Sequence, residues 1–274
     1  MTMRAWRGRE SELGEALFPD LTERSAAAAD PAELWITTQT LRLRAGDFGA
    51  RLASHPDPEN RAALDAGFAA AAALAARCGI PVPDPDEFWA AGAPPRFPAP
   101  SGATRDLELG TRFLPVPAPH GLGAHAWQRA FADGSLADDL ALSMSSEVVR
   151  WFAALDAPAS RHTPRLTRAT PLGPVHWTLR WVPAAPAAPL LGHAHSTAMS
   201  TNYPTLPEML LLQIARARCG AAPLDKHSFT WLAGELPDTR FAARHGSDIA
   251  NYTVRIGTRE RTDQGPHIGT RLAH

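Results

Sequence analysis

The sequence has no long apolar run and only two cysteines among its 274 residues. No stretch approaches the roughly 20 apolar residues that a membrane-spanning helix needs. The basic start of the chain is followed by no apolar segment, so we do not expect a signal peptide. Two cysteines are too few for a disulfide framework and are typical of small buried side chains. We therefore expect a cytoplasmic protein without a membrane partner.

An excess of one charge is also absent. The 27 Lys and Arg residues and the 28 Asp and Glu residues give a net charge of −1, so no overall field attracts nucleic acid. The chain has no Gly-rich phosphate loop, Gly-x-Ser-x-Gly elbow, Cys-x-x-Cys pair or His-Glu-x-x-His helix. The regular basic and aromatic pattern of an RNA-binding sheet is absent too. The expected partner is a small molecule or another protein.

An internal similarity is the main positive feature of the sequence. Both cysteines, Cys78 and Cys219, lie in the tetrapeptide Ala-Arg-Cys-Gly, and other residues recur around them in the same order. The clearest matched pairs are Thr40 with Thr178, Asp84 with Asp225, Phe88 with Phe229, Trp89 with Trp231, and Gly110 with Gly257. The similarity predicts an α+β fold, formed by internal duplication of a ββαβ-like unit with pseudo-two-fold symmetry. Two such units can cover each other's apolar sheet faces.

The similarity also predicts how the chain is divided, with a helical insert between the repeats. The expected segments are an N-terminal arm at 1–30, a first repeat at 31–118, a linker and helical insert at 119–160, a second repeat at 161–262, and a C-terminal tail at 263–274. The tail is polar, so we expect it to be frayed.

Local signals predict three helices. One begins at Asp57 and ends before Gly79, a residue type that commonly follows a helix. A second begins at Thr205, where Glu208 three residues later completes a capping box. A third is predicted over 136–156, because its apolar residues fall near helical spacing.

A hairpin is predicted where residues 165–170 and 175–182 flank Pro171-Leu172-Gly173-Pro174. In the second strand Val175, Trp177, Leu179 and Trp181 alternate with polar residues, so the polar residues share the opposite face. If the segment 190–199 returns beside this strand, His176 lies roughly opposite His195.

Histidines distinguish the second repeat from the first. The predicted metal ligands, which would share one sheet face within reach of a divalent ion, are His176, His193 and His195. His176 and His195 are also the candidate catalytic residues. The candidate ligand-binding residues are Thr178, Arg180 and His227. The alternative is a solvated sheet face with scattered imidazoles.

Two of these histidines begin similar triplets. His176-Trp177-Thr178 and His195-Ser196-Thr197 both read His-x-Thr. The pair is similar to the motifs of the two-histidine phosphoesterases, and this resemblance implies that the histidines act as acid and base on a phosphodiester. Here both triplets lie in the second repeat, and the first repeat has none.

The sequence thus leaves three functions open. The first is a small-molecule-binding protein or enzyme that uses the histidine-rich face, with or without a divalent metal. The second is a non-catalytic protein-binding or chaperone-like module that presents the duplicated sheets. The third is a phosphoesterase-like enzyme. An enclosed cavity with converging histidines favours the first function, and a patch of exposed tryptophans favours the second.

Overall fold

The computed structural model describes residues 58–93, 113–132, 134, 136–137, 140–171, 173–248 and 251–274. All of them belong to one compact unit, 56–274. Its helices are α4 (Pro58–Cys78), α5 (Pro85–Ala90), α7 (Ala124–Phe131), α8 (Ser146–Arg150), α9 (Phe152–Leu155), the 3-10 turn η2 (Ser200–Asn202) and α10 (Leu206–Arg218). Its strands are β1 (Phe113–His120), β2 (Ala141–Met144), β3 (Arg165–Thr170), β4 (Gly173–Pro183), β5 (Leu190–Leu191), β6 (Phe229–Trp231), β7 (Phe241–Ser247), β8 (Thr253–Glu260) and β9 (Ile268–Thr270).

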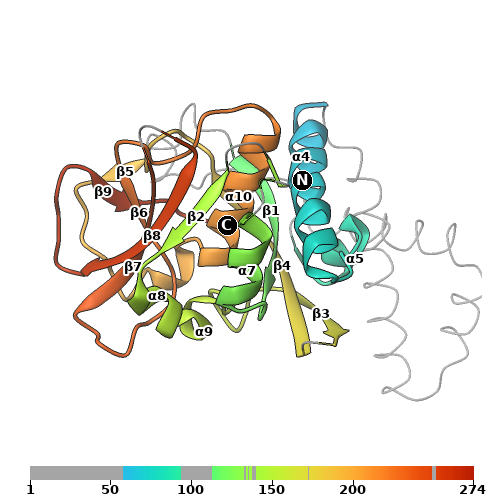
Figure 1. Ribbon diagram of the computed structural model, residues 1–274, viewed down its shortest axis with the longest axis horizontal. Coiled ribbons are helices and arrows are strands. Elements are labelled where there is room, and N and C mark those ends of the chain that lie inside the picture. Colours follow the sequence, from blue (N-terminus) through green and yellow to red (C-terminus); the bar gives the residue numbers. More distant parts are fainter. Residues whose placement is uncertain are drawn as a thin grey trace, which may run out of the picture. The chain divides into compact units, whose positions relative to one another are not determined.

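The strands form two sheets (Figure 1). A three-stranded antiparallel sheet has the order β1-β4-β3, and a six-stranded sheet has the order β2-β8-β7-β6-β9-β5. In the larger sheet β2 runs parallel to β8 and β6 runs parallel to β9, and its other pairs are antiparallel. The mixture of helices with mainly antiparallel strands confirms the predicted α+β class.

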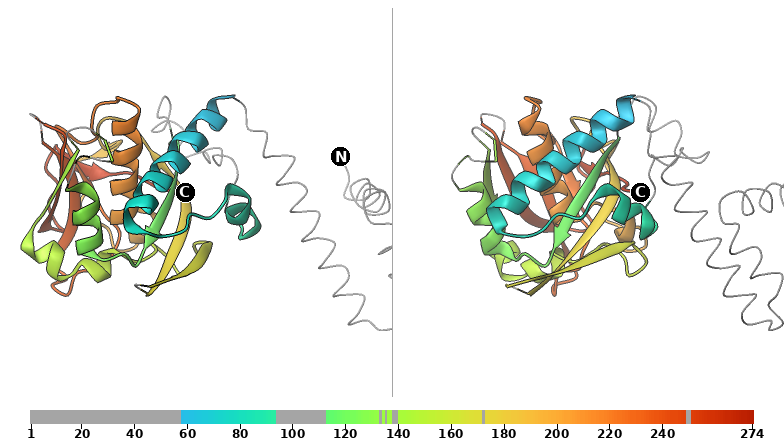
Figure 2. Two further views of the ribbon diagram at one scale, coloured as in Figure 1. Left: turned by 45° about the vertical axis from the view of Figure 1, so that its right-hand side comes forward. Right: turned by 90° about the vertical axis from the view of Figure 1, so that its right-hand side faces the viewer.

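Helix α10 is the centre of the main core. Every residue from Leu206 to Ala215 is buried, including Glu208 and Gln213. The helix packs against both α4 and β1 (Figure 2). The main core also includes Ala243 of β7 and Val254 of β8 from the larger sheet. Because α10 is covered all round, its apolar residues need not be confined to one stripe.

The local signals that end α4 and that begin and end α10 are confirmed. Thr205 accepts a hydrogen bond from the Glu208 backbone N–H, and the Glu208 carboxylate accepts one from the Thr205 backbone N–H. Gly79 and Gly220, which follow α4 and α10, both have a φ of 66°. The hairpin of β3 and β4 is confirmed as well. In the described part of the chain, no helix is both long and apolar enough to cross a membrane.

The helix predicted over 136–156 is wrong. Strand β2 occupies residues 141–144 of this range, and the short helices α8 and α9 follow. Leu140, Leu142 and Met144 all pack on the main core, as the period-2 spacing of a strand also allows. Ser145 then starts α8 as its N-cap, accepting a hydrogen bond from the Val148 backbone N–H.

The predicted pairing of 175–182 with 190–199 is also wrong. Strand β4 pairs with β1 and β3, whereas β5 pairs with β9 in the other sheet. The proline-rich connection therefore carries the chain from one sheet to the other. The face that carries Thr178 and Arg180 is covered by protein, and both side chains are buried.

The structure does not show the internal duplication. The matched residues agree at the helix ends, where Cys78 closes α4 and Cys219 follows α10. Beyond that point they diverge, because Phe88 lies in helix α5 and its counterpart Phe229 lies in strand β6. The expected burial of both cysteines is wrong too, since Cys78 is half-buried and Cys219 is exposed, and both are free thiols. Gly110 and the strands expected before Asp57 lie outside the described residues.

The C-terminal segment 261–274 is an ordered part of the fold, so the prediction of a frayed tail is wrong. Strand β9 joins the six-stranded sheet between β6 and β5. Farther on, the backbone of His274 exchanges two hydrogen bonds with that of Trp181 in β4, at 2.7 and 2.9 Å. The segment thus connects the two sheets.

Candidate functional site

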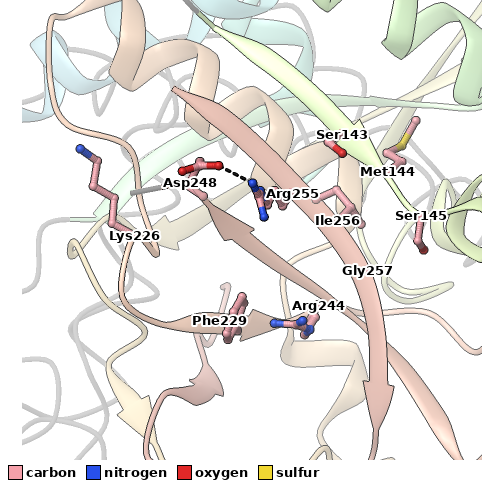
Figure 3. A pocket seen from close by; sticks show the side chains of 11 residues that line it. Ser143, Met144, Ser145, Lys226, Phe229, Arg244, Asp248, Arg255, Ile256 and Gly257 are labelled. Atoms are coloured by element: carbon pink, nitrogen blue, oxygen red, sulfur yellow. Dashed lines mark hydrogen bonds and ion pairs between the residues drawn. The ribbon is translucent and has the colours of Figure 1, made fainter. Parts of the chain in front are cut away.

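A hollow of about 510 Å³ lies at the six-stranded sheet (Figure 3). Strands β2, β6, β7 and β8 and the loops beside them supply its lining. The lining residues are Ser143, Met144, Ser145, Lys226, Phe229, Arg244, Ser247, Asp248, Arg255, Ile256 and Gly257. One lining residue, Phe229, also packs against a second, smaller core that includes Tyr203 and Trp231.

Gly257 forms part of the hollow because it has no side chain. It pairs with Arg244 across β7 and β8, and a Cβ placed on it would meet no atom within 4 Å. Its φ is not positive, so its backbone does not require glycine. Gly246 differs, since a Cβ there would lie 2.6 Å from the Phe229 ring. Gly246 is needed for packing, whereas Gly257 leaves open space and weakens the strand.

Arg244 has hydrogen-bonding groups that the described residues do not satisfy. Its guanidinium carbon lies 3.7 Å from the centroid of the Phe229 ring, a cation–π contact that fixes the side chain. Its Nε and Nη1 atoms are shielded from solvent and have no acceptor among the described residues. Burial, followed by the positive charge of Arg259, lowers the pKa of Arg244, and Asp263 partly opposes the shift. Arg244 lines the hollow, so it presents a fixed positive charge to an anion bound there. A bound acceptor that reached the shielded N–H groups would also offset the cost of leaving them unsatisfied.

Two further cations and one carboxylate line the same hollow. Arg255 of β8 forms an ion pair with Asp248 (Figure 3). Neither Lys226 nor Arg244 has a carboxylate ion-pair partner within the described ranges. The lining therefore carries two cations that the described protein groups do not neutralise.

Two serine hydroxyls of the lining already accept hydrogen bonds from the protein. Ser145 Oγ accepts from the Val148 backbone N–H at 3.3 Å. Ser247 Oγ accepts from Gln213 Nε2 at 3.0 Å. Because a hydroxyl has one hydrogen to donate as well as lone pairs, each of these serines keeps its O–H for another acceptor.

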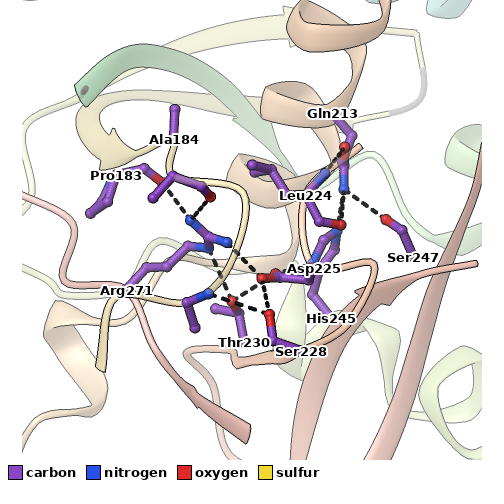
Figure 4. A network of polar contacts seen from close by, with 12 residues as sticks. Pro183, Ala184, Gln213, Leu224, Asp225, Ser228, Thr230, His245, Ser247 and Arg271 are labelled. Carbon is purple, nitrogen blue, oxygen red and sulfur yellow. Dashed lines mark hydrogen bonds and ion pairs between the residues drawn. The ribbon is translucent and has the colours of Figure 1, made fainter. Parts of the chain in front are cut away.

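A buried polar network lies between α10 and the six-stranded sheet and includes the lining residue Ser247 (Figure 4). Its centre is Asp225, a 1% exposed residue with a φ of 57°. The four side-chain donors around its carboxylate are Arg271 at 2.6 Å, Thr230 at 2.7 Å, Ser228 at 3.0 Å and His245 Nδ1 at 3.0 Å. Burial alone would raise the pKa of Asp225, but the charge of Arg271 and the hydrogen bond from His245 hold it well below its usual value. The carboxylate therefore stays ionised and fully hydrogen-bonded.

Gln213 connects this network to Ser247. Its amide forms a reciprocal pair with Leu224, accepting from the backbone N–H at 3.2 Å and donating to the carbonyl at 3.3 Å. This pairing fixes which end of the amide is nitrogen. The two hydrogens of Gln213 Nε2 are shared among three acceptors, the Leu224 carbonyl, Ser247 Oγ and His245 Nε2. With its Nε2 accepting, the His245 ring donates from Nδ1 to Asp225. An amide does not relay protons readily, so the network positions Ser247 rather than activating it.

The predicted histidine site is not assembled. His176 lies on β4, where its Nδ1 contacts Thr167 Oγ1 at 2.9 Å. His195 is buried against the other sheet, where Arg261 Nε donates to its Nδ1 at 3.1 Å. His193 is exposed, and only its backbone carbonyl is used, by Trp231 Nε1. Within the described part of the chain, no group of three or more His, Cys, Asp or Glu side chains is placed to hold a metal ion.

His195 has the contacts of a histidine in a core. Its Nε2 lies 3.3 Å from the carbonyl of Leu232, and its ring packs edge-on against Tyr203 and Trp231. Burial, together with the charge of Arg261, lowers its pKa to about 4. A neutral imidazole with both nitrogens occupied is suited to packing rather than to acid–base chemistry.

The three predicted ligand-binding residues do not form one site, because Thr178 and Arg180 lie on a covered face of β4 and His227 lies in the loop before β6. Thr178 is buried and bonded to His120 Nε2 at 3.0 Å. Arg180 is buried beside Glu208 and donates to the carbonyls of Tyr203, Thr201 and Ala273. His227 is exposed and follows Lys226. Arg180 also borders a second cavity of about 330 Å³, but its Nη1 and Nη2 atoms already donate to protein acceptors.

The residues of the hollow were not predicted as a site, although two of them carry a signal in the sequence. Lys226 is the one lysine among the 27 basic residues. Gly257 interrupts a strand pattern without turn residues beside it. Arg244 and Ser143 have no such signal, because strand pairing alone brings them together.

Comparison of the chain with protein-family models, with curated proteins and with solved structures finds no match.

Proposed function

We propose that the protein binds a small anionic molecule in the hollow beside Gly257. This keeps the small-molecule function expected from the sequence and replaces the histidines with cations as the binding groups. The observation that carries the proposal is Arg244, a lining cation without a carboxylate partner among the described residues, whose Nε and Nη1 also lack an acceptor there. Phe229 holds the guanidinium in place before any ligand arrives, so little conformational freedom is lost on binding.

The protein-binding alternative has less support. Of the six tryptophans that the structure describes, Trp127, Trp177, Trp181 and Trp231 are completely buried and Trp89 is partly buried. Trp151 alone among them is largely exposed, at 39%. The patch of exposed tryptophans that would favour a protein partner is therefore not found in the described ranges. The cytoplasmic location and the phosphoesterase activity remain predictions.

Calorimetric titration with inorganic phosphate tests the proposal. We expect the wild-type protein to bind phosphate and Arg244→Gln to bind it at least roughly tenfold more weakly, because a charged hydrogen bond is lost. Arg240→Gln is the matched control, since the Arg240 side chain is 78% exposed, pairs with Asp238 and does not line the hollow. Equal phosphate affinity in Arg244→Gln and the wild type would overturn the proposal, as would no binding by the wild type.

A further inference from the structure

The charges in the hollow narrow the class of ligand, and this step rests on the proposed function. Lys226 and Arg244 are the two lining cations without a carboxylate partner among the described residues, while Arg255 is neutralised by Asp248. A ligand that balances the hollow therefore carries about two negative charges. A phosphate monoester meets this condition near neutral pH, where its charge is about −1.5 to −2.

The polar groups of the lining indicate what the rest of the ligand is like. Ser145 and Ser247 accept hydrogen bonds from the protein, so their hydroxyl hydrogens are available to acceptors in the hollow. Asp248 adds a carboxylate, which accepts hydrogen bonds from ligand hydroxyls but repels a second anion. An ester whose organic part carries hydroxyl groups satisfies both kinds of group.

The size of the hollow agrees with an organic phosphate rather than with phosphate alone. Its volume of about 510 Å³ lies in the range of roughly 300–1,000 Å³ that is usual for small-molecule sites. The apolar part of the lining is limited to Phe229, Met144 and Ile256, and the Phe229 ring is engaged by Arg244. A large apolar body would find few partners there.

We infer that the ligand is a phosphate monoester of a small polyhydroxylated molecule, of the kind that sugar phosphates represent. The phosphate lies toward Arg244 and Lys226, and the hydroxyl groups lie toward Asp248 and the serines. Asp248 thereby makes the hollow prefer this ligand to a simple dianion. Its carboxylate accepts hydrogen bonds from ligand hydroxyls and repels additional negative charge.

The test is a calorimetric comparison of four probes: inorganic phosphate, glucose 6-phosphate, glucose and malate, a dicarboxylate with one hydroxyl group. We expect glucose 6-phosphate to bind at least about tenfold more tightly than inorganic phosphate, and glucose not to bind. In Asp248→Asn, phosphate affinity should rise, because Arg255 is released, while the preference for glucose 6-phosphate should shrink. Circular dichroism checks that this change at a partly buried side chain leaves the fold intact.

The outcomes separate this inference from the proposed function. If phosphate binds and glucose 6-phosphate binds no better, the ligand class is wrong and anion binding stands. Malate binding as tightly as glucose 6-phosphate would also overturn the ligand class. An unchanged preference in Asp248→Asn would remove the role given to Asp248. If none of the anions binds, both the inference and the proposed function are wrong.

Discussion

Asp156, which follows α9, is a buried carboxylic acid with an incomplete set of partners. Its Oδ2 accepts a hydrogen bond from the Gly123 backbone N–H at 2.7 Å, and its Oδ1 has no partner among the described residues. Burial raises its pKa to about 7, although the backbone N–H groups of Gly123, Gly121 and Leu122 oppose the shift. The acid is therefore protonated in the native state over a pH range where it is ionised in the unfolded chain.

This shift predicts a pH-dependent stability. Between pH 4 and pH 7 the native state holds a proton that the unfolded state has lost, so stability due to Asp156 falls as the pH rises through this window. Asp156→Asn cannot ionise. We expect the free energy of unfolding of the wild type, relative to this variant, to fall by about 2–4 kcal/mol from pH 4 to pH 8. Urea unfolding at several pH values measures it, and a constant difference would contradict the raised pKa.

At the same scale, a substitution of Gly257 should affect ligand binding and leave stability almost unchanged. The position has open space and ordinary backbone angles, and β-branched residues favour strands. We expect Gly257→Val to keep or raise the free energy of unfolding, by up to about 1 kcal/mol, and to abolish phosphate binding because the hollow is filled. Thermal melting and calorimetry measure the two effects.

Gly246→Ala is the matched control for this substitution. Its Cβ would overlap the Phe229 ring, so this variant should lose stability. If Gly257→Val were the less stable of the two variants, Gly257 would be a structural glycine.

At the scale of elements, Gly67 sets how closely α4 approaches β1. A Cβ on this buried residue would overlap the carbonyl oxygen of Pro115. Helix propensity alone predicts that Gly67→Ala stabilises α4 by about 1 kcal/mol. We expect the cost of the overlap to exceed this gain, so that the free energy of unfolding of the variant falls by about 1–3 kcal/mol. Urea unfolding measures it. Ala69→Gly, at an exposed position of the same helix, gives the propensity effect alone, and a more stable Gly67→Ala would show that α4 and β1 do not touch at this point.

The elements also show what could be predicted from the sequence. Helices α4 and α10 and the β3–β4 hairpin were predicted because caps, helix-ending glycines and turn prolines act within a few residues. The long helix over 136–156 failed because Leu140 and Met144 are four residues apart, a spacing that fits a helix and also a strand with Leu142 between them. The pairing of β4 failed because strand partners are chosen by contacts between distant segments, which no local pattern records.

The candidate site could not be predicted from the sequence for the same reason. His176 and His195 have the same His-x-Thr pattern, yet they face different sheets. Arg244 and Ser143 come together because β8 pairs with both β7 and β2. Single-residue signals at Lys226 and Gly257 were present in the sequence, but only the strand pairing gives them a common location.

At the scale of the whole molecule, the C-terminal segment is attached through a buried ion pair. Arg271 is completely buried, pairs with Asp225 and donates to the carbonyls of Pro183 and Ala185. Through Asp225, it is connected to the polar network behind the six-stranded sheet. The tail, expected to be frayed, is thus attached at the middle of the fold.

This attachment predicts that the stability of the protein depends strongly on the ion pair between Arg271 and Asp225. Arg271→Met leaves the Asp225 carboxylate buried without its cation, and we expect a loss of roughly 3–5 kcal/mol in the free energy of unfolding. Adding Asp225→Asn removes the unpaired charge, so the double variant should recover part of the loss. Guanidinium unfolding of Arg271→Met, of Asp225→Asn and of the double variant measures this. A double variant whose loss equals the sum of the two single losses would show that the two residues are not coupled.

The most direct test of the central claim is a crystal structure of the protein grown with saturating inorganic phosphate. We predict tetrahedral density in the hollow beside Gly257, within hydrogen-bonding distance of the Arg244 guanidinium. A structure in which the hollow holds only water, with the Arg244 N–H groups bonded to protein acceptors, would contradict the account.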